Sequence, residues 1–282
     1  MACPTTELLD TDRPQNAVAD PDKRTPKFLS LDIETTTEVE GLPEGMQAGL
    51  DQRCSSITDV SLAARDALGT ITVDVISVVG AHARYDHERK TTVLDGGRPA
   101  HAERIYGDTT LHQVPSEMQL LQTLASVLAN RAREATCLTT WNGSVFDLPF
   151  IIDREAATSS VHHLRTMLQL AYDPKVWVKY DPLPGHEGGY RARIIAGGAT
   201  LDHLDVAPVA RPFADEHGIK CSLKPVGRAL GFDPIEVDAS KMHLLSDAER
   251  AAYVGSDAIL TLQEAEYFAG AAVKGKQYDS MR

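Results

Sequence analysis

The sequence predicts an α/β domain in which a mixed β-sheet is flanked by helices. The strand-like segments of the first half are joined by short connections, which favour antiparallel pairing. The strand-like segment at 135–141 instead follows a helical crossover and can pair in parallel. Of the 282 residues, 43% are hydrophobic and 24% are charged, as is ordinary for a globular protein with a sizeable core.

The first strand is marked by alternation of apolar and polar residues. In the segment LSLDIE, every second side chain is apolar, which predicts a strand with one apolar face over 27–37. Runs rich in β-branched residues predict further strands. These lie at 71–81, 89–96, 103–107 and 135–141.

Capping-box spacing marks the start of two helices, because a serine and a glutamine or glutamate three residues later can exchange hydrogen bonds. The pairs are Ser116 with Gln119 and Ser246 with Glu249, and the second helix is expected to run to about Gly270. Two shorter helices are expected at 147–157 and 222–231, the latter ending at a glycine.

The organisation of the chain is interpreted as one domain, 27–270, between a flexible N-terminal tail, 1–26, and a C-terminal tail, 271–282. Segment 38–70 contains glycine, proline and serine and is interpreted as an insertion with a short helix near 61–67. Segment 171–200 is interpreted as a second insertion, in which KVWVKY and YRARII can form two strands.

Composition limits the classes of function. The net charge of −12 argues against a protein that holds nucleic acid by bulk charge alone. The four cysteines are scattered without a CxxC pair, so neither a zinc ribbon nor a disulfide framework is indicated. Without a signal-like segment or an apolar run of membrane-spanning length, the expected location is cytoplasmic and no membrane partner is expected.

Acidic residues recur at the ends of the predicted elements. Asp32 and Glu34 are two residues apart in a strand, so their side chains share one face and repel unless a cation lies between them. Asp147 lies where the strand at 135–141 gives way to a helix. Taken alone, such acids are more often solvated strand faces or helix-dipole partners.

The C-terminal helix carries a further pair. Tyr253 and Asp257 are four residues apart and share one helix face. Gly255 between them costs about 1 kcal/mol relative to alanine, which indicates close approach by another backbone or a ligand. Taken alone, such a pair is more often a surface tyrosine beside a surface acid.

Together these segments resemble the three motifs of the DEDD 3′–5′ exonucleases. They are D-x-E in LDIETT, N-x3-F-D in WNGSVFDLP and Y-x3-D in YVGSD. The third motif is that of the tyrosine subclass, since Ala252 stands where the histidine subclass has its histidine. The chain also resembles the exonuclease domains of family B DNA polymerases, and the resemblance implies an RNase H-like fold.

The resemblance also implies two divalent cations, Mg²⁺ or Mn²⁺, held by carboxylates. Asp32 would bridge both cations, and Glu34 and Asp257 would hold the one that carries the attacking water. Asp147 would support the second cation, and Tyr253 would orient the water. The products would be nucleoside 5′-monophosphates.

Substrate contacts are expected from Thr35, Asn142 and Phe146, with Phe146 either stacking on a base or packing in the core. Lys220, Lys224 and Arg228 either contact phosphates or form a solvated helix face. Asp205 is expected to have a structural role that supports the site.

The polymerase-like second motif favours single-stranded DNA as substrate. An exoribonuclease or oligoribonuclease of the same chemistry is the first alternative, because no residue contacting a 2′-hydroxyl can be singled out. A non-catalytic nucleic-acid-binding module is the second. A proofreading or repair role beside a polymerase partner is a third possibility.

Overall fold

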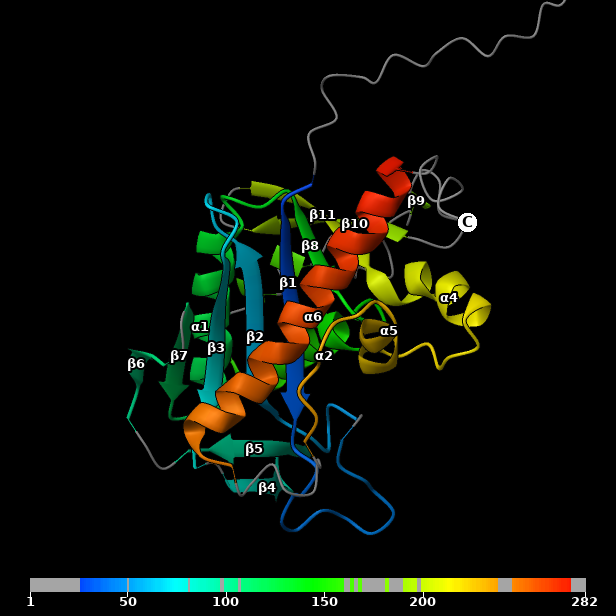
Figure 1. Cartoon of the computed structure of the whole chain (residues 1–282). Helices are drawn as coiled ribbons and strands as arrows, with labels where there is room; N and C mark the ends of the chain where they lie inside the picture. The colour runs from blue at the N-terminus through cyan, green and yellow to red at the C-terminus, as the bar shows by residue number, and fades with distance from the viewer. Residues whose placement is uncertain are drawn as a thin grey trace, which may run out of the picture.

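The computed structural model describes residues 26–49, 51–80, 82–96, 99–105, 108–159, 163–164, 167–168, 181–182, 190–196, 199–237 and 245–274 (Figure 1). Within these residues the main sheet has nine strands. Their spatial order is β6 (His101–Arg104), β7 (Thr109–Val114), β3 (Ile71–Val78), β2 (Ile57–Arg65), β1 (Phe28–Thr35), β8 (Cys137–Thr140), β11 (Ala199–Asp205), β10 (Tyr190–Ala196) and β9 (Asp181–Pro182).

The sheet is mixed, as the sequence predicts. Strand β1 pairs antiparallel with β2 and parallel with β8, and β8 in turn pairs parallel with β11. Strand β2 pairs antiparallel with β3. The parallel pairs β1–β8 and β8–β11 each have a helix between their two strands in the sequence, whereas β3 pairs parallel with β7 across a stretch that contains only strands. This mixed sheet, flanked by helices, is compatible with a single RNase H-like domain.

Helices cover both faces of the sheet (Figure 1). On one face, α1 (Glu117–Arg131) and α2 (Asp147–Thr158) pack in a core with the apolar side chains of β1. On the other, α6 (Asp247–Lys274) crosses β1, β2 and β3. Helices α4 (Val206–Glu216) and α5 (Leu223–Ala229) contact α6. The central strand β1 is therefore covered from both sides.

The interpretation of 38–70 as an insertion is wrong for its second half. Residues 57–65 form β2, a central strand, and there is no helix at 61–67. Both faces of β2 are buried, so apolar and polar residues do not alternate along it. Ser61 and Ala63, in the middle of this strand, are both fully buried.

Other elements differ in extent or were not predicted. Strands β4 (His82–Asp86) and β7 and helix α4 were missed, and the strand expected at 103–107 lies at His101–Arg104. The segment KVWVKY lies outside the described residues, whereas YRARII is confirmed as part of β10, in the main sheet. Helix α6 continues to Lys274, so 271–274 do not belong to a tail. Residues 1–25 and 275–282 lie outside the described part.

A fully buried ion pair joins the two helices of one layer. The guanidinium of Arg154 in α2 donates to both carboxylate oxygens of Glu117 in α1, and neither side chain is more than 1% exposed. The backbone N–H of Ile57 donates to Glu117 at 2.7 Å. Arg154 also donates to four further oxygens, which are Gln52 O, Ser56 Oγ, Thr91 Oγ1 and Thr92 O. This network fixes α1, α2 and the approach to β2.

We expect Glu117→Ala to lower the free energy of unfolding by about 3–5 kcal/mol, because it leaves the buried charge of Arg154 unpaired. Urea unfolding measures this loss. Asp51→Ala is the matched control, since it breaks the exposed pair with Arg53 and costs at most about 1 kcal/mol. Equal losses in the two variants would contradict this role for the buried pair.

Glu264 of α6 is a second buried acid, and the described part of the chain offers it no hydrogen-bond partner. Neither carboxyl oxygen of Glu264 in α6 has a hydrogen-bond partner among the described residues, and burial raises the pKa of Glu264 to about 9. One of its oxygens lies 3.1 Å from where a Cβ on Gly227 of α5 would stand. The folded protein therefore keeps a proton on Glu264 at neutral pH.

The stability that this protonated group contributes is fully present below pH 4.5, the ordinary pKa of glutamic acid, and is lost as pH rises to about 9. The unfolded chain releases the proton within that window, whereas the folded chain keeps it. We expect Glu264→Gln to raise the melting temperature increasingly from pH 5 to pH 9. A difference between the two proteins that stays constant with pH would refute this assignment.

Candidate metal centre

The alternation of β1 divides its side chains between two layers. Leu29, Leu31 and Ile33 enter the core shared with α1 and α2. The intervening residues therefore point toward α6. Of these, Asp32 lies opposite Ser61 of β2, and Glu34 lies opposite Asp59.

Helix α6 lies unusually close to these strands because small residues meet at the contact. The hydroxyl of Ser30 donates to the carbonyl of Ala258 at 2.7 Å, and that of Ser61 donates to the carbonyl of Val254 at 2.9 Å. A Cβ placed on Gly255 would lie 3.2 Å from Cγ1 of Val73 in β3. The close approach that Gly255 indicates in the sequence is therefore to the sheet.

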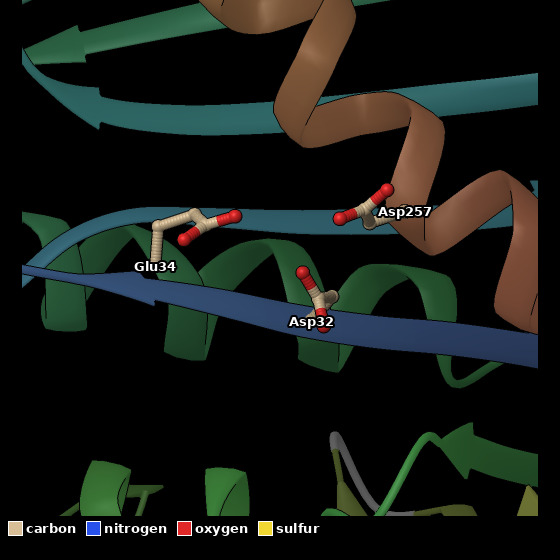
Figure 2. Close-up of side chains that lie close together, drawn as sticks. All are labelled: Asp32, Glu34 and Asp257. Atoms are coloured by element: carbon tan, nitrogen blue, oxygen red, sulfur yellow. The ribbon is translucent and has the colours of Figure 1, made fainter. Parts of the chain in front are cut away.

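This seating brings three of the predicted carboxylates together. Oxygens of Asp32, Glu34 and Asp257 all lie within 4.8 Å of one another. Figure 2 shows the three side chains converging from β1 and α6. Within the described part of the chain, no other group of three or more such residues is placed to share a metal ion. Hard divalent cations prefer such oxygen ligands.

Electrostatics in this cluster disfavour three free carboxylates. Burial, then the charges of Asp147, Glu34 and Asp257, raise the pKa of Asp32 well above its ordinary value. Burial, then the charges of Asp59 and Asp257, raise the pKa of Glu34 to about 7. One oxygen of Asp257 is buried without a hydrogen-bond partner among the described residues. A divalent cation would fit this donor set, because it would neutralise the repulsion and satisfy that oxygen.

One ammonium group already lies at the cluster. Nζ of Lys224 in α5 is 3.2 Å from Oδ2 of Asp257 and donates to the hydroxyl of Tyr253 at 3.3 Å. Its side chain is only 16% exposed, so a solvated helix face is the wrong description of Lys224. Sequence patterns give no sign of this pair, because α5 and α6 meet only in the folded chain.

The tyrosine of the third motif is also part of the site. Tyr253 is 9% exposed and Asp257 is 7% exposed, so neither is a surface residue. The hydroxyl oxygen of Tyr253 accepts from Lys224. Its own proton is thereby left available for donation.

Asp147 lies outside the group of three carboxylates but acts electrostatically on Asp32. It is the first residue of α2 and is buried, but it is not among the carboxylates within 4.8 Å of one another. Burial, reinforced by the charge of Asp205, raises the pKa of Asp147 to about 7, while hydrogen bonds from the backbone of Asp147 and Ile33 oppose the shift. Its charge nevertheless contributes to the raised pKa of Asp32.

The loop before Asp147 is anchored by Asp205, at the end of β11. The carboxylate of Asp205 accepts the backbone N–H groups of Asn142 at 2.7 Å and Ser144 at 3.1 Å. Asn142 has a φ of +60°, in the left-handed region. Gly143 leaves no room for a side chain, since a Cβ would lie 2.3 Å from Oγ1 of Thr140. The structural role expected of Asp205 is therefore confirmed.

The expected substrate contacts lie in different surroundings. Asn142 is exposed, whereas Phe146 packs against Phe150 with 5.3 Å between ring centroids. The hydroxyl of Thr35 donates to the carbonyl of Gly49 at 2.8 Å and is engaged within the protein. The core interpretation thus accounts for Phe146, while a contact from Asn142 stays a prediction.

The remaining basic candidates and a buried histidine lie outside the cluster. Lys220 and Arg228 are exposed, and Arg228 pairs with Glu236. They therefore fit a solvated face. His203 is fully buried, and its Nε2 lies 2.9 Å from Oγ1 of Thr140. Burial lowers the pKa of His203 to about 4, so this ring is neutral.

Comparison with known proteins adds no family assignment: no protein-family model matches this chain, and no curated protein matches it. None of the helices in the described ranges is both long and apolar enough to cross a bilayer.

We expect Asp32→Asn to raise the melting temperature of the metal-free protein, because the variant removes one charge from a mutually repelling cluster. The same change should abolish the rise in melting temperature that Mn²⁺ produces in the unmodified protein, since only a ligand of the folded state stabilises it. Thermal unfolding with and without Mn²⁺ measures both effects. A Mn²⁺ response that survives in Asp32→Asn would rule out this cluster as the metal site.

Proposed function

We propose that the protein is a metal-dependent 3′–5′ exonuclease that removes nucleotides from single-stranded nucleic acid, with DNA favoured over RNA. The observation that carries the proposal is the convergence of Asp32, Glu34 and Asp257 within 4.8 Å, with Tyr253 one helical turn before Asp257. Residues from motifs more than 200 positions apart in the sequence meet at one point. Their order and spacing resemble those of the DEDD exonucleases.

In this proposal Asp32, Glu34 and Asp257 would hold one Mg²⁺ or Mn²⁺ ion, and Asp147 would contribute with Asp32 to a second. Bound cations of this type lower the pKa of an attacking water and stabilise the departing 3′ oxygen. Hydrolysis then releases nucleoside 5′-monophosphates.

The protein's own groups position the reactants. Tyr253 has a hydroxyl proton free to donate, because its oxygen already accepts from Lys224. It can therefore orient a water beside Asp257. Lys224 neutralises Asp257 in the absence of metal, and a divalent cation competes with this ammonium for the same carboxylate.

Two alternatives differ in substrate or in class. An exoribonuclease or oligoribonuclease would use the same carboxylates, because the chemistry at phosphorus is unchanged. A non-catalytic binding module would need none of them, yet the four acids and Tyr253 are all present. One buried oxygen of Asp257 also has no hydrogen-bond partner among the residues that the structure describes. The geometry therefore favours an enzyme. A cytoplasmic location and a polymerase or repair partner complete the proposal.

The decisive measurement is degradation of 5′-labelled single-stranded DNA and RNA of matched sequence in Mn²⁺ or Mg²⁺. We expect a descending ladder on DNA and a loss of about 10³-fold in Asp257→Asn, because metal ions supply several kcal/mol of transition-state stabilisation. Glu38→Gln is the matched control, since it neutralises an exposed acid outside the cluster, four residues after Glu34. This control should retain full activity.

Each result has a distinct meaning. A ladder on RNA alone would keep the mechanism and change the substrate. Metal binding without any ladder would favour the binding module. Undiminished cleavage by Asp257→Asn would remove the cluster from the reaction.

A further inference from the structure

Another acid, Asp59, lies beside the cluster on the same face of the sheet. Asp59 of β2 is directly opposite Glu34 of β1 in the antiparallel register. Side chains opposite one another in this way have Cβ atoms about 4.5–5.5 Å apart, and like charges in such pairs repel. Asp59 has no exposed surface, so water does not screen it.

Arg250 of α6 forms a salt bridge with this acid. Nε of Arg250 lies 3.0 Å and 3.1 Å from the two carboxylate oxygens of Asp59, and its Nη2 bonds to Asp59 as well. The hydroxyl of Ser77 in β3 donates to Asp59 at 2.6 Å. Both oxygens of Asp59 are therefore engaged by Arg250, and one of them also accepts from Ser77.

Arg250 also belongs to the site by position. It precedes Asp257 by seven residues, or about two helical turns, so the two share one face of α6. The charge of Asp59 raises the pKa of Glu34 and that of Arg250 lowers it, which places all three groups within electrostatic reach.

We propose that Arg250 is a positioning residue of the metal centre: it sequesters Asp59, so that Glu34 serves the site shared with Asp32 and Asp257. The inference rests on the proposed function. Without Arg250, Asp59 and Glu34 form a competing pair of carboxylates on adjacent strands. A divalent cation held by that pair is displaced from Asp257 and from Tyr253 beside it.

The first test reads metal binding without activity. Mn²⁺ affinity is measured by electron paramagnetic resonance of free Mn²⁺ in the full-length protein, Asp257→Asn, Arg250→Met and the double variant. We expect Asp257→Asn alone to weaken Mn²⁺ binding by about 100-fold or more. Loss of a group that hydrogen-bonds to a metal ligand typically lowers metal affinity by about 10–100-fold, and loss of a ligand itself should cost at least as much. In the Arg250→Met background, Asp257→Asn should weaken Mn²⁺ binding by less than about tenfold, because Asp59 replaces the missing ligand.

The second test uses rescue. Arg250→Met should lower kcat on single-stranded DNA while Mn²⁺ binding persists, and adding Asp59→Asn should restore kcat by about tenfold or more. The double variant has no unpaired buried charge at this position, so it is expected to fold even if Arg250→Met alone does not. Arg65→Met is the matched control, since Arg65 of β2 pairs with Glu266 of α6 at the other end of the helix. This control should leave kcat unchanged.

The outcomes separate the two proposals. If the unmodified protein produces no ladder, the nuclease proposal fails, and Mn²⁺ binding still reports on Arg250. If Asp257→Asn weakens Mn²⁺ binding equally with and without Arg250, Asp59 is not a competitor and the inference is overturned. It is also overturned if Arg250→Met with Asp59→Asn stays as inactive as Arg250→Met alone, since Arg250 would then act directly on substrate.

Discussion

The close seating of α6 on β1 and β2 is the contact on which the site depends. Four helical residues advance about 6 Å and two strand residues about 6.6 Å, so matching partners recur along the contact. Ala258 meets Ser30, Val254 meets Ser61 and Arg250 meets Asp59 in turn. Asp257 precedes Ala258 in this row of contacts, and its carboxylate therefore reaches Asp32 and Glu34. A larger residue at Ser30, Ser61 or Gly255 would separate the carboxylates as it lifts the helix.

The same seating confines charges that repel. Three acids share the cluster with one ammonium, and burial is the largest cause of the raised pKa of each acid. The apolar cores on both faces of β1 hold these groups together against that repulsion. Such strain is typical of functional sites, where binding of a ligand relieves what folding alone leaves unsatisfied.

Local patterns predicted the elements that carry the site, and long-range pairing explains what they missed. Alternation identified β1, and helical spacing placed Tyr253 and Asp257 on one face of α6, since both depend only on near neighbours. Strand β2 escaped because burial on both faces removes alternation. Lys224 and Asp257 are 33 positions apart and join two helices. Arg250 and Asp59 are 191 positions apart and join a helix to a strand. No local sequence pattern encodes either pair.

Asp147, the fourth carboxylate of the motifs, is positioned in a different way from the other three. Asp32, Glu34 and Asp257 come from a strand and a helix in direct contact, whereas Asp147 follows a loop held by backbone hydrogen bonds to Asp205. Arg154, two turns further along α2, fixes that helix to α1 through Glu117. If the centre holds two cations, one position is formed by packing of α6 and the other by the anchoring of this loop. The two positions can then differ in affinity, because a loop yields more readily than a packed helix.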